Sequence, residues 1–224
     1  MSRPAIDTAM NYDYFYFMGQ AENTTLQKIL KVAEDEFLDK GFRGASLRTI
    51  VKKAGVTTGA FYGYFKSKED LFDALVKEHA DYILGIYDNI LEEFEKMPLE
   101  QQMDSMDDYS SLGLQKMFEY VWEHKTAFRL ISKAADGTKY ENFMQKIAQK
   151  DIDSTDDFYN LLESQGKAVE RIDPLIEQIV ITGTFATFFT LLLRDIPKDE
   201  AKRGLSQMFR FYRGGWNSLM HFDN

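Results

Sequence analysis

Two short helical segments joined by a glycine turn constrain the fold of this chain more than any other feature. Ser46 is a good helix cap, and the segment that it opens ends at Gly55, a residue that readily adopts a positive φ. Thr57 can cap a second short segment, in which Phe61 and Phe65 recur at the spacing of a helical turn. This pattern predicts a helix-turn-helix, a unit whose second helix enters the major groove of DNA.

Longer helices are predicted on both sides of this unit. Apolar residues across Leu26–Phe37 follow a helical period, and Lys40-Gly41 is a suitable helix end. Ser67 begins a capping-box pattern that opens a second long helix, and Met97-Pro98 stops that helix.

The same region is strongly basic within an acidic chain. The chain has 27 Lys and Arg against 36 Asp and Glu, for a formal net charge of −9. Residues 40–68 hold seven of these cations and no acid. A local cation cluster on such a unit is expected of a surface that binds DNA phosphates. The net charge argues against nonspecific coating of nucleic acid, but not against site-specific binding.

Beyond Pro98 the pattern remains helical. Helices are expected at 108–123, 125–135, 139–165, 174–194 and 198–221, and no strand alternation, internal repeat or low-complexity tract interrupts them. We therefore predict an all-α protein. A three-helix helix-turn-helix DNA-binding domain is expected at 23–70, followed by a larger helical domain at 71–224.

Residues 1–22 fall outside this pattern. Asn11–Met18 contains five aromatic residues without a helical period. Two interpretations remain open: the segment is a non-native or disordered extension, with Met18 as the natural first residue, or it is an arm that packs on the body or on a partner.

The side chains that an enzyme or a metal protein would need are sparse. The chain has no cysteine, and its histidines, His79, His124 and His221, are far apart in sequence. No phosphate-cradling glycine loop appears. The acid pairs Asp107-Asp108 and Asp156-Asp157 are interpreted as solvated helix residues. We therefore expect no catalytic site, metal or cofactor.

A membrane protein is also disfavoured. The apolar run Ile179–Leu193 has about 15 residues and is shorter than a ~20-residue span. It is interpreted as a buried helix. The N-terminus does not read as a signal peptide, because Asp7 and Asp13 interrupt any apolar segment. The lack of cysteine fits a cytoplasmic protein.

Four short motifs occur in order within residues 41–71. They are the Gly41-Phe42 helix end, the Ala54-Gly55-Val56 turn, the aromatic Phe61-Tyr62-x-Tyr64-Phe65 helix and the Lys66–Leu71 exit. Together they resemble the N-terminal domain of TetR-family transcriptional regulators. The resemblance covers about residues 24–75. Beyond them the chain resembles the family in size, in helix content and in the late stretch Arg213–Trp216.

The resemblance implies a homodimer that binds a palindromic operator in double-stranded DNA. It also implies that the C-terminal domain binds a small-molecule effector and dimerises through its last two long helices. Most such proteins look like repressors that a small molecule releases. The choice between repressor and activator stays open, because the position of the operator decides whether binding represses or activates transcription.

The expected DNA contacts lie on the two short helices and at the start of the next one. Arg48, by resemblance, and Lys52 suit base edges or phosphates, and the first turn of the second short helix lies nearest the bases. Gly63 stands where many relatives carry a larger contact residue, and Lys68 is expected to hold a phosphate. The full set is Arg48, Lys52, Thr57, Thr58, Gly59, Ala60, Tyr62, Gly63, Tyr64 and Lys68.

A mostly apolar or aromatic effector is expected between the C-terminal helices. Aromatic and methionine side chains could line its pocket, although plain core packing is the commoner role for aromatics at helical spacing. The candidates are Met103, Met117, Phe118, Trp122, Phe128, Phe143, Tyr159, Phe185, Phe188 and Phe189.

The last two helices are expected to form a four-helix dimer interface, with burial inside one subunit as the alternative. The alternative for the whole protein is a helical adaptor that uses the same scaffold to bind another protein.

Overall fold

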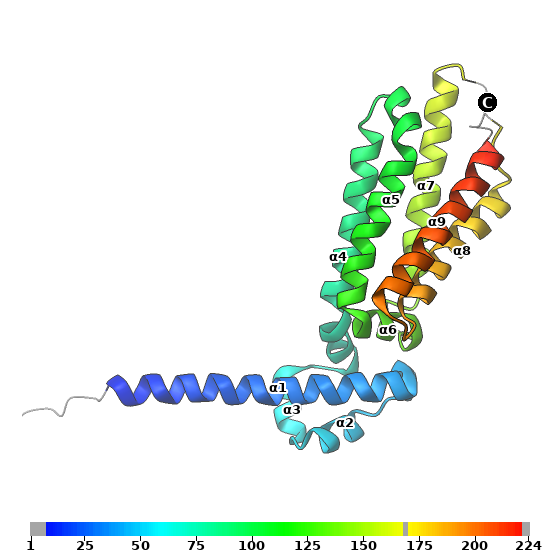
Figure 1. Ribbon diagram of the computed structural model, residues 1–224. Coiled ribbons are helices and arrows are strands. Elements are labelled where there is room, and N and C mark those ends of the chain that lie inside the picture. The colour runs from blue at the N-terminus through cyan, green and yellow to red at the C-terminus, as the bar shows by residue number, and fades with distance from the viewer. Residues whose placement is uncertain (1–7, 168–169, 221–224) are drawn as a thin grey trace, which may run out of the picture. The chain divides into compact units, whose positions relative to one another are not determined.

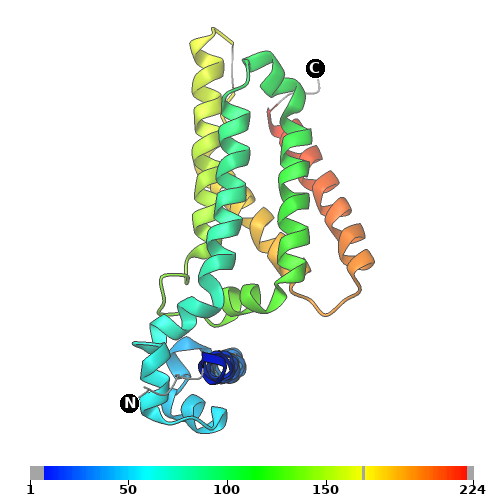
Figure 2. The same ribbon diagram turned by 90° about the vertical axis from the view of Figure 1, so that its left-hand side faces the viewer.

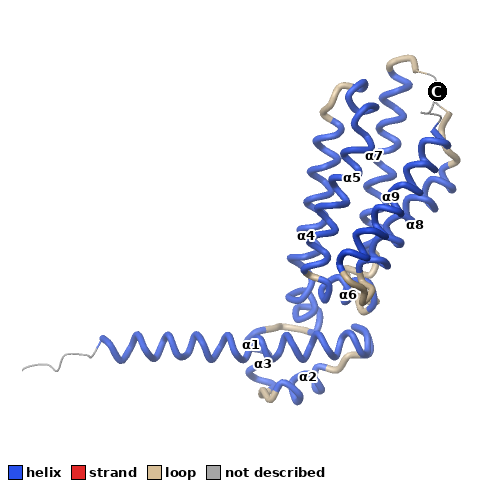
Figure 3. Tube along the Cα trace, viewed as in Figure 1, coloured by secondary structure: helices blue, strands red, loops and turns tan. Residues whose placement is uncertain are grey.

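The computed structural model describes residues 8–167 and 170–220, and these contain helices but no strand (Figure 1, Figure 3). The all-α prediction is confirmed. The described residues divide into two compact units, one of residues 8–75 with 136–138 and one of residues 76–135 with 139–220. The division falls after Leu75, a few residues beyond the expected boundary.

The first unit contains α1 (Thr8–Gly44), α2 (Leu47–Ala54), α3 (Thr58–Tyr64) and the start of α4 (Lys68–Glu95). The predicted caps are confirmed. The Ser46 side chain accepts from the Thr49 amide, and the Thr57 side chain accepts from the Ala60 amide at 3.1 Å. Gly55 ends α2 with φ of 67°, a conformation that costs glycine little.

Aromatic side chains form the core of this unit. The rings of Phe37 and Phe42 meet the Phe72 ring edge to face, with centroids 5.1 and 5.5 Å away. Phe61 and Phe65 are also buried, as predicted. The ring contacts therefore join α1 to α4, and exposed residues remain on the other faces of α2 and α3.

The first helix is longer than predicted. It begins at Thr8, whereas the sequence predicts regular helix only from Thr24. Once the later turns have formed, each added residue contributes a hydrogen bond without a new nucleation cost, so a helix can extend through a segment that lacks an apolar stripe. Regular helix breaks at Gly41 (φ 69°), near its predicted end, before one more turn to Gly44.

The second unit contains the rest of α4, α5 (Leu99–Glu123), α6 (Lys125–Lys133), α7 (Phe143–Ser164), α8 (Pro174–Leu192) and α9 (Lys198–Met220). Its long helices lie side by side, and α8 packs against both α7 and α9 (Figure 1, Figure 2). The predicted cap of α8 is confirmed, since Asp173 accepts from the Leu175 amide at 2.9 Å.

Two helix starts differ from the prediction. The fifth helix begins directly after Pro98, and the buried Gln102 side chain donates to the Met97 carbonyl at 2.8 Å. That local hydrogen bond between a side chain and the backbone stabilises a first turn that lacks an apolar period. The seventh helix begins at Phe143 rather than at residue 139, because residues 139–142 form turns.

The apolar eighth helix is 19 residues long, and it is the one described helix that could cross a membrane by length and composition. The sequence-based estimate of a shorter run began at Ile179 and omitted the first turn. A helix from the core of a globular protein passes the same test. About 33% of this helix is buried inside the unit, so it is less covered than predicted.

Candidate DNA-binding surface and ligand cavity

The predicted DNA contacts on α2 and α3 lie largely on the exposed side of these helices. Arg48 and Lys52 are exposed, as are all four residues of Thr57–Ala60. Tyr62 is 55% exposed although it is aromatic, and Gly63 is exposed beside it. Tyr64 is half-buried. The apolar side chains of α3 face the core, so the exposed face is left to polar groups and small residues.

The exposed face has a positive charge that the surrounding acids only partly balance. Lys53 pairs with the buried Glu36 at 2.8 Å, and Asp70 accepts from the backbone amide of Lys66. Within the described part of the chain, Arg48 and Lys52 form no ion pair. These two cations therefore remain available for an anionic partner.

The ammonium group of Lys68 is directed at the protein itself. Its Nζ donates to the carbonyl oxygens of Phe42 at 2.7 Å and Ala45 at 3.1 Å, and lies 3.4 Å from that of Arg43. It also lies 4.6 Å from the centroid of the Phe42 ring. Lys68 thus joins the start of α4 to the last turn of α1 and to Ala45, which follows it. Whether it also contacts phosphate stays a prediction.

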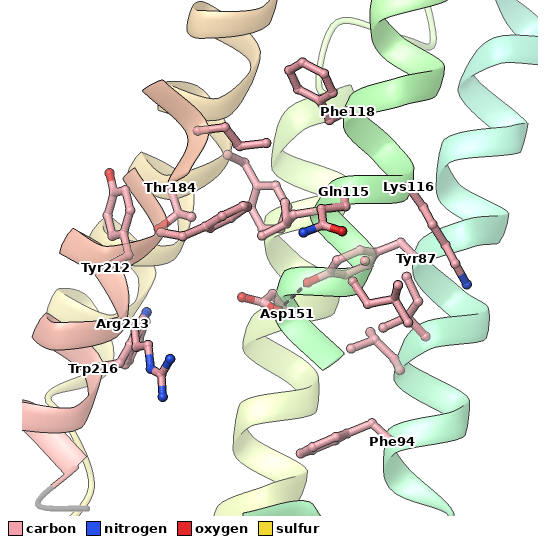
Figure 4. A pocket seen from close by; sticks show the side chains of 18 of the residues that line it. Tyr87, Phe94, Gln115, Lys116, Phe118, Asp151, Thr184, Tyr212, Arg213 and Trp216 are labelled. Atoms are coloured by element: carbon pink, nitrogen blue, oxygen red, sulfur yellow. Dashed lines mark hydrogen bonds between the residues drawn. The ribbon is translucent and has the colours of Figure 1, made fainter. Parts of the chain in front are cut away.

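The second unit holds a cavity of about 930 Å³ between α4, α5, α7, α8 and α9 (Figure 4). Its walls are mainly apolar and aromatic, with polar groups from several helices directed inward. The apolar wall residues include Ile90, Leu91, Phe94, Phe158, Leu205, Phe209 and Trp216. A space of this size and lining is typical of a site for a small organic molecule.

Two of the ten predicted ligand residues, Phe118 and Phe185, line this cavity. Most of the others lie in the core, where aromatic side chains pack on one another. Phe128 and Phe189 have ring centroids 6.1 Å apart, for example. The fully or almost fully buried residues of the predicted set that do not line the cavity are Met117, Phe128, Phe143, Tyr159, Phe188 and Phe189.

The remaining two predicted ligand residues lie closer to solvent. Met103 is 38% exposed, and Trp122 is half-buried under the Lys125 ammonium, 3.4 Å from its ring centroid. Neither is a lining residue of the cavity.

The sequence prediction omitted a polar pair in the cavity. The Tyr87 hydroxyl donates to Oδ1 of Asp151, which joins α4 to α7 (Figure 4). Burial raises the pKa of the Asp151 carboxyl, and the Tyr87 hydrogen bond opposes that shift. Burial, and then the Asp151 charge, raises the pKa of Tyr87 well above its usual 10.0, so Tyr87 stays a neutral donor.

A signal for this pair exists in the sequence. Asp151 lies one helical turn after Ile147 and two turns before Phe158, so it interrupts the apolar face of α7. The neighbouring acids Asp153 and Asp156 fall on the exposed side. A single acid on an otherwise apolar face marks a polar group directed into the protein.

Two of the histidines are brought together, although they are far apart in sequence. The rings of His79 and His124 have centroids 4.5 Å apart, and Nδ1 of His79 lies 3.0 Å from the Tyr120 hydroxyl. Burial, and then the nearby His124, lowers the pKa of His79. The expectation of isolated histidines is therefore wrong for this pair, while His221 lies outside the described residues. In the described part of the chain no cluster of three metal-ligating side chains occurs.

Comparison with known proteins gives the same result for the helix-turn-helix. Residues 29–75 match the family described as "Bacterial regulatory proteins, tetR family". The HTH-type transcriptional repressor KstR2 of Mycolicibacterium smegmatis is 32% identical over 65 residues, which are 29% of this chain and 32% of that relative. The A-factor receptor protein of Streptomyces griseus is 23% identical over 188 residues, 83% of this chain and 61% of the relative. The alignments thus span less than two thirds of these relatives.

Solved structures share the fold at low identity. A TetR-family regulator from Streptomyces coelicolor has a TM-score of 0.56 and 16% identity, covering 84% of this chain and 90% of its own. The regulator FadR of Bacillus subtilis, in complex with stearoyl-CoA, has a TM-score of 0.51 and 17% identity, covering 83% and 96%. The motifs of α2 and α3, the family match and the shared fold agree: residues 29–75 are a helix-turn-helix domain of the tetR family, and the chain as a whole shares the fold of TetR-family regulators.

Proposed function

We propose that this protein is a homodimeric repressor that binds a palindromic operator and is released by a small, mostly apolar effector. The observation that carries the proposal is the exposed, acid-free surface of α2 and α3, with Arg48 and Lys52 unpaired among the described residues. Relatives that are named as transcriptional repressors support repression rather than activation.

In the proposed complex α3 lies in the major groove. Its first turn is made of exposed small residues, which allow close approach to the bases and provide few side chains that could read them. Arg48 on α2 would therefore supply much of the direct base contact, while Lys52, Tyr62 and Tyr64 contact phosphate. For Lys68 we propose a positioning role, because its ammonium already holds three backbone carbonyls.

The proposed dimer interface is the open face of α8 and α9. These helices follow one another in a hairpin, so the start of α8 lies beside the end of α9 (Figure 1). Leu175 is 62% exposed and Phe211 is 76% exposed, and Ile176, Ile179 and Leu219 are exposed too. Several large apolar side chains exposed on neighbouring helices are typical of a surface that another protein covers. A second copy of the same hairpin would bury them in a four-helix interface.

The proposed effector site is the cavity of the second unit. Its apolar walls suit an apolar molecule, and the fold is shared with a regulator whose structure contains stearoyl-CoA. The fourth helix supports coupling between this site and DNA, because it begins in the first unit and lines the cavity at Tyr87 and Ile90.

The proposal is tested by selecting bound sequences from a random DNA pool at about 0.15 M salt, the regime in which specific binding is distinguished from phosphate binding. We expect an enriched palindrome with half-sites about one helical turn apart, bound far more tightly than random DNA. Absence of enrichment, both before and after the protein is unfolded, washed and refolded, would contradict operator binding and favour the adaptor. The refolding step removes any bound molecule that could hold the protein in a released state.

A further inference from the structure

Asp151 is a half-buried acid that lines the mainly apolar cavity of the second unit, and one of its two carboxyl oxygens has no hydrogen-bond partner among the described residues. Oδ1 accepts from Tyr87. No hydrogen bond to Oδ2 is found within residues 8–167 and 170–220, and the residue lines the cavity (Figure 4). Oδ2 therefore remains accessible from the cavity, and a donor on a molecule that enters the cavity can bind it.

The position of Asp151 is held firmly from both sides. The preceding residue, Lys150, pairs with Asp88 of α4 at 2.6 Å, while Asp151 itself binds Tyr87 of α4. Two consecutive residues of α7 are therefore tied to two consecutive residues of α4. The free oxygen is thus preorganised, which lowers the entropy that a ligand loses on binding.

The protein supplies no cation to this carboxyl. Burial raises the pKa of Asp151 and the Tyr87 hydrogen bond lowers it, and no lysine or arginine contributes. The four cations among the lining residues, Lys116, Lys202, Arg210 and Arg213, all have exposed side chains, and Lys202 is held by Glu119 at 2.8 Å. A positive charge on a ligand beside Asp151 would meet an uncompensated acid in a medium of low polarity.

We infer that the effector is an apolar molecule with one basic nitrogen, whose ammonium group donates to the free oxygen of Asp151 while its apolar body lies against the aromatic walls. The inference rests on the proposed function, because it deepens the description of the same cavity. The aromatic walls add favourable contacts for a cation, and Phe94, Phe158 and Trp216 are among them.

The test compares three probes with the same chain and different ends: dodecylamine, dodecanol and dodecanoate, each kept below its micelle concentration. The chain has two tryptophans, and Trp216 lines the cavity. A Trp122→Phe background therefore leaves one fluorescent reporter at the site. We expect dodecylamine to bind about tenfold to a hundredfold more tightly than dodecanol, as a charge-assisted hydrogen bond would produce. Dodecanoate should bind most weakly.

Two matched variants locate the effect. Asp151→Asn keeps an oxygen for Tyr87 but removes the charge, and it should abolish the preference for the amine. Asp153→Asn removes an exposed acid from the same helix and should leave the preference intact. Tyr87→Phe keeps the Asp151 carboxylate and should also keep the preference for the amine. Circular dichroism establishes that each variant is folded.

Equal binding of dodecylamine and dodecanol, no binding of any probe, or a preference that survives Asp151→Asn would overturn the inference. Operator release is measured separately with each probe. If dodecylamine binds through Asp151 without weakening operator binding, the ligand class is supported and the effector role fails. If dodecylamine and dodecanol bind equally and dodecanol or dodecanoate releases the operator, the cavity is the effector site but the effector is not a basic molecule.

Discussion

Two roles proposed for Lys68, a structural contact with backbone carbonyls and a contact with phosphate, predict different measurements. Its ammonium donates to carbonyls of Phe42 and Ala45. We expect Lys68→Met to lower the free energy of unfolding by about 1.5–3 kcal/mol, the range for hydrogen bonds that involve a charge. The salt dependence of operator binding should be nearly unchanged, because that slope counts cations on phosphates.

Urea unfolding and a salt titration of operator affinity measure the two quantities. Lys66→Met is the control, because its side chain is exposed and only its backbone amide has a hydrogen bond here. A slope for Lys68→Met that is flatter by about one unit would instead indicate a direct phosphate contact, as the resemblance suggests.

The Thr57 cap is expected to stabilise α3. Its side chain accepts from the Ala60 amide, and α3 has only seven residues. Thr57→Ala should therefore destabilise the protein by about 1 kcal/mol, the usual cost of a lost helix cap. Thr57→Ser should restore most of this loss in chemical denaturation. Equal stability of the alanine and serine variants would show that the cap contributes nothing.

At the scale of helices, the contact of His79 with α5 and His124 predicts acid sensitivity. Because burial lowers the pKa of His79 below its usual 6.5, the folded state binds fewer protons than the unfolded state. The contribution of neutral His79 to the free energy of unfolding is thus fully present above about pH 6.5, the usual pKa of histidine. It is lost as the pH falls through the lower pKa of His79 in the folded state.

Thermal unfolding between about pH 7.5 and 5 should therefore show a smaller loss of stability for His79→Gln than for the wild type, because the wild type must protonate or expose this ring. The charged groups that influence His79 are His124 and Glu78. The Tyr120 hydroxyl also faces the ring. Identical pH profiles of the two proteins would assign the acid sensitivity to other groups.

The open face of α8 and α9 predicts an oligomeric state. A charge in place of Phe211, which is 76% exposed, would be buried without a partner if a second copy covers this face. We expect Phe211→Asp to convert a dimer into monomers in sedimentation equilibrium, with helix content retained. Met103→Asp changes a less exposed apolar residue of α5 and should leave the dimer intact. A wild-type monomer at micromolar concentration would contradict the proposed interface.

At the scale of the whole molecule, the basic residues 40–68 give an acidic protein a local positive surface on which DNA binding is proposed. The formal net charge is −9, and residues 40–68 contain no acid. Lys52→Ala should flatten the salt slope of operator binding by about one unit, because its cation is proposed to contact phosphate, whereas Arg48→Ala should weaken operator binding with little change in the slope. Lys146→Ala, an exposed cation of α7, is the control and should leave the slope unchanged. A slope for Arg48→Ala that is flatter by about one unit would instead assign Arg48 to phosphate.

Local patterns determined much of this protein. The caps at Ser46, Thr57 and Asp173 and the glycine turn at Gly55 are confirmed, because a cap needs only a side chain and an amide a few positions away. Family resemblance within residues 24–75 was predictable for the same reason, since the helix-turn-helix is defined by short spacings. The helix starts at Thr8 and Leu99 were not predictable, because each depends on propagation or on a contact that no apolar period announces.

Only the tertiary structure decided where the ligand cavity lies and what it contains. Phe118 and Phe185 line it, whereas the other predicted phenylalanines and Tyr159 fill the core and Trp122 lies closer to solvent. Tyr87 and Asp151 are 64 positions apart and meet only when α4 packs against α7. A helical pattern predicts which residues share a face, but packing across the whole unit decides which element covers that face. The sequence by itself therefore determined the helices and the helix-turn-helix motif. Only the tertiary structure placed Tyr87 and Asp151 together in the cavity.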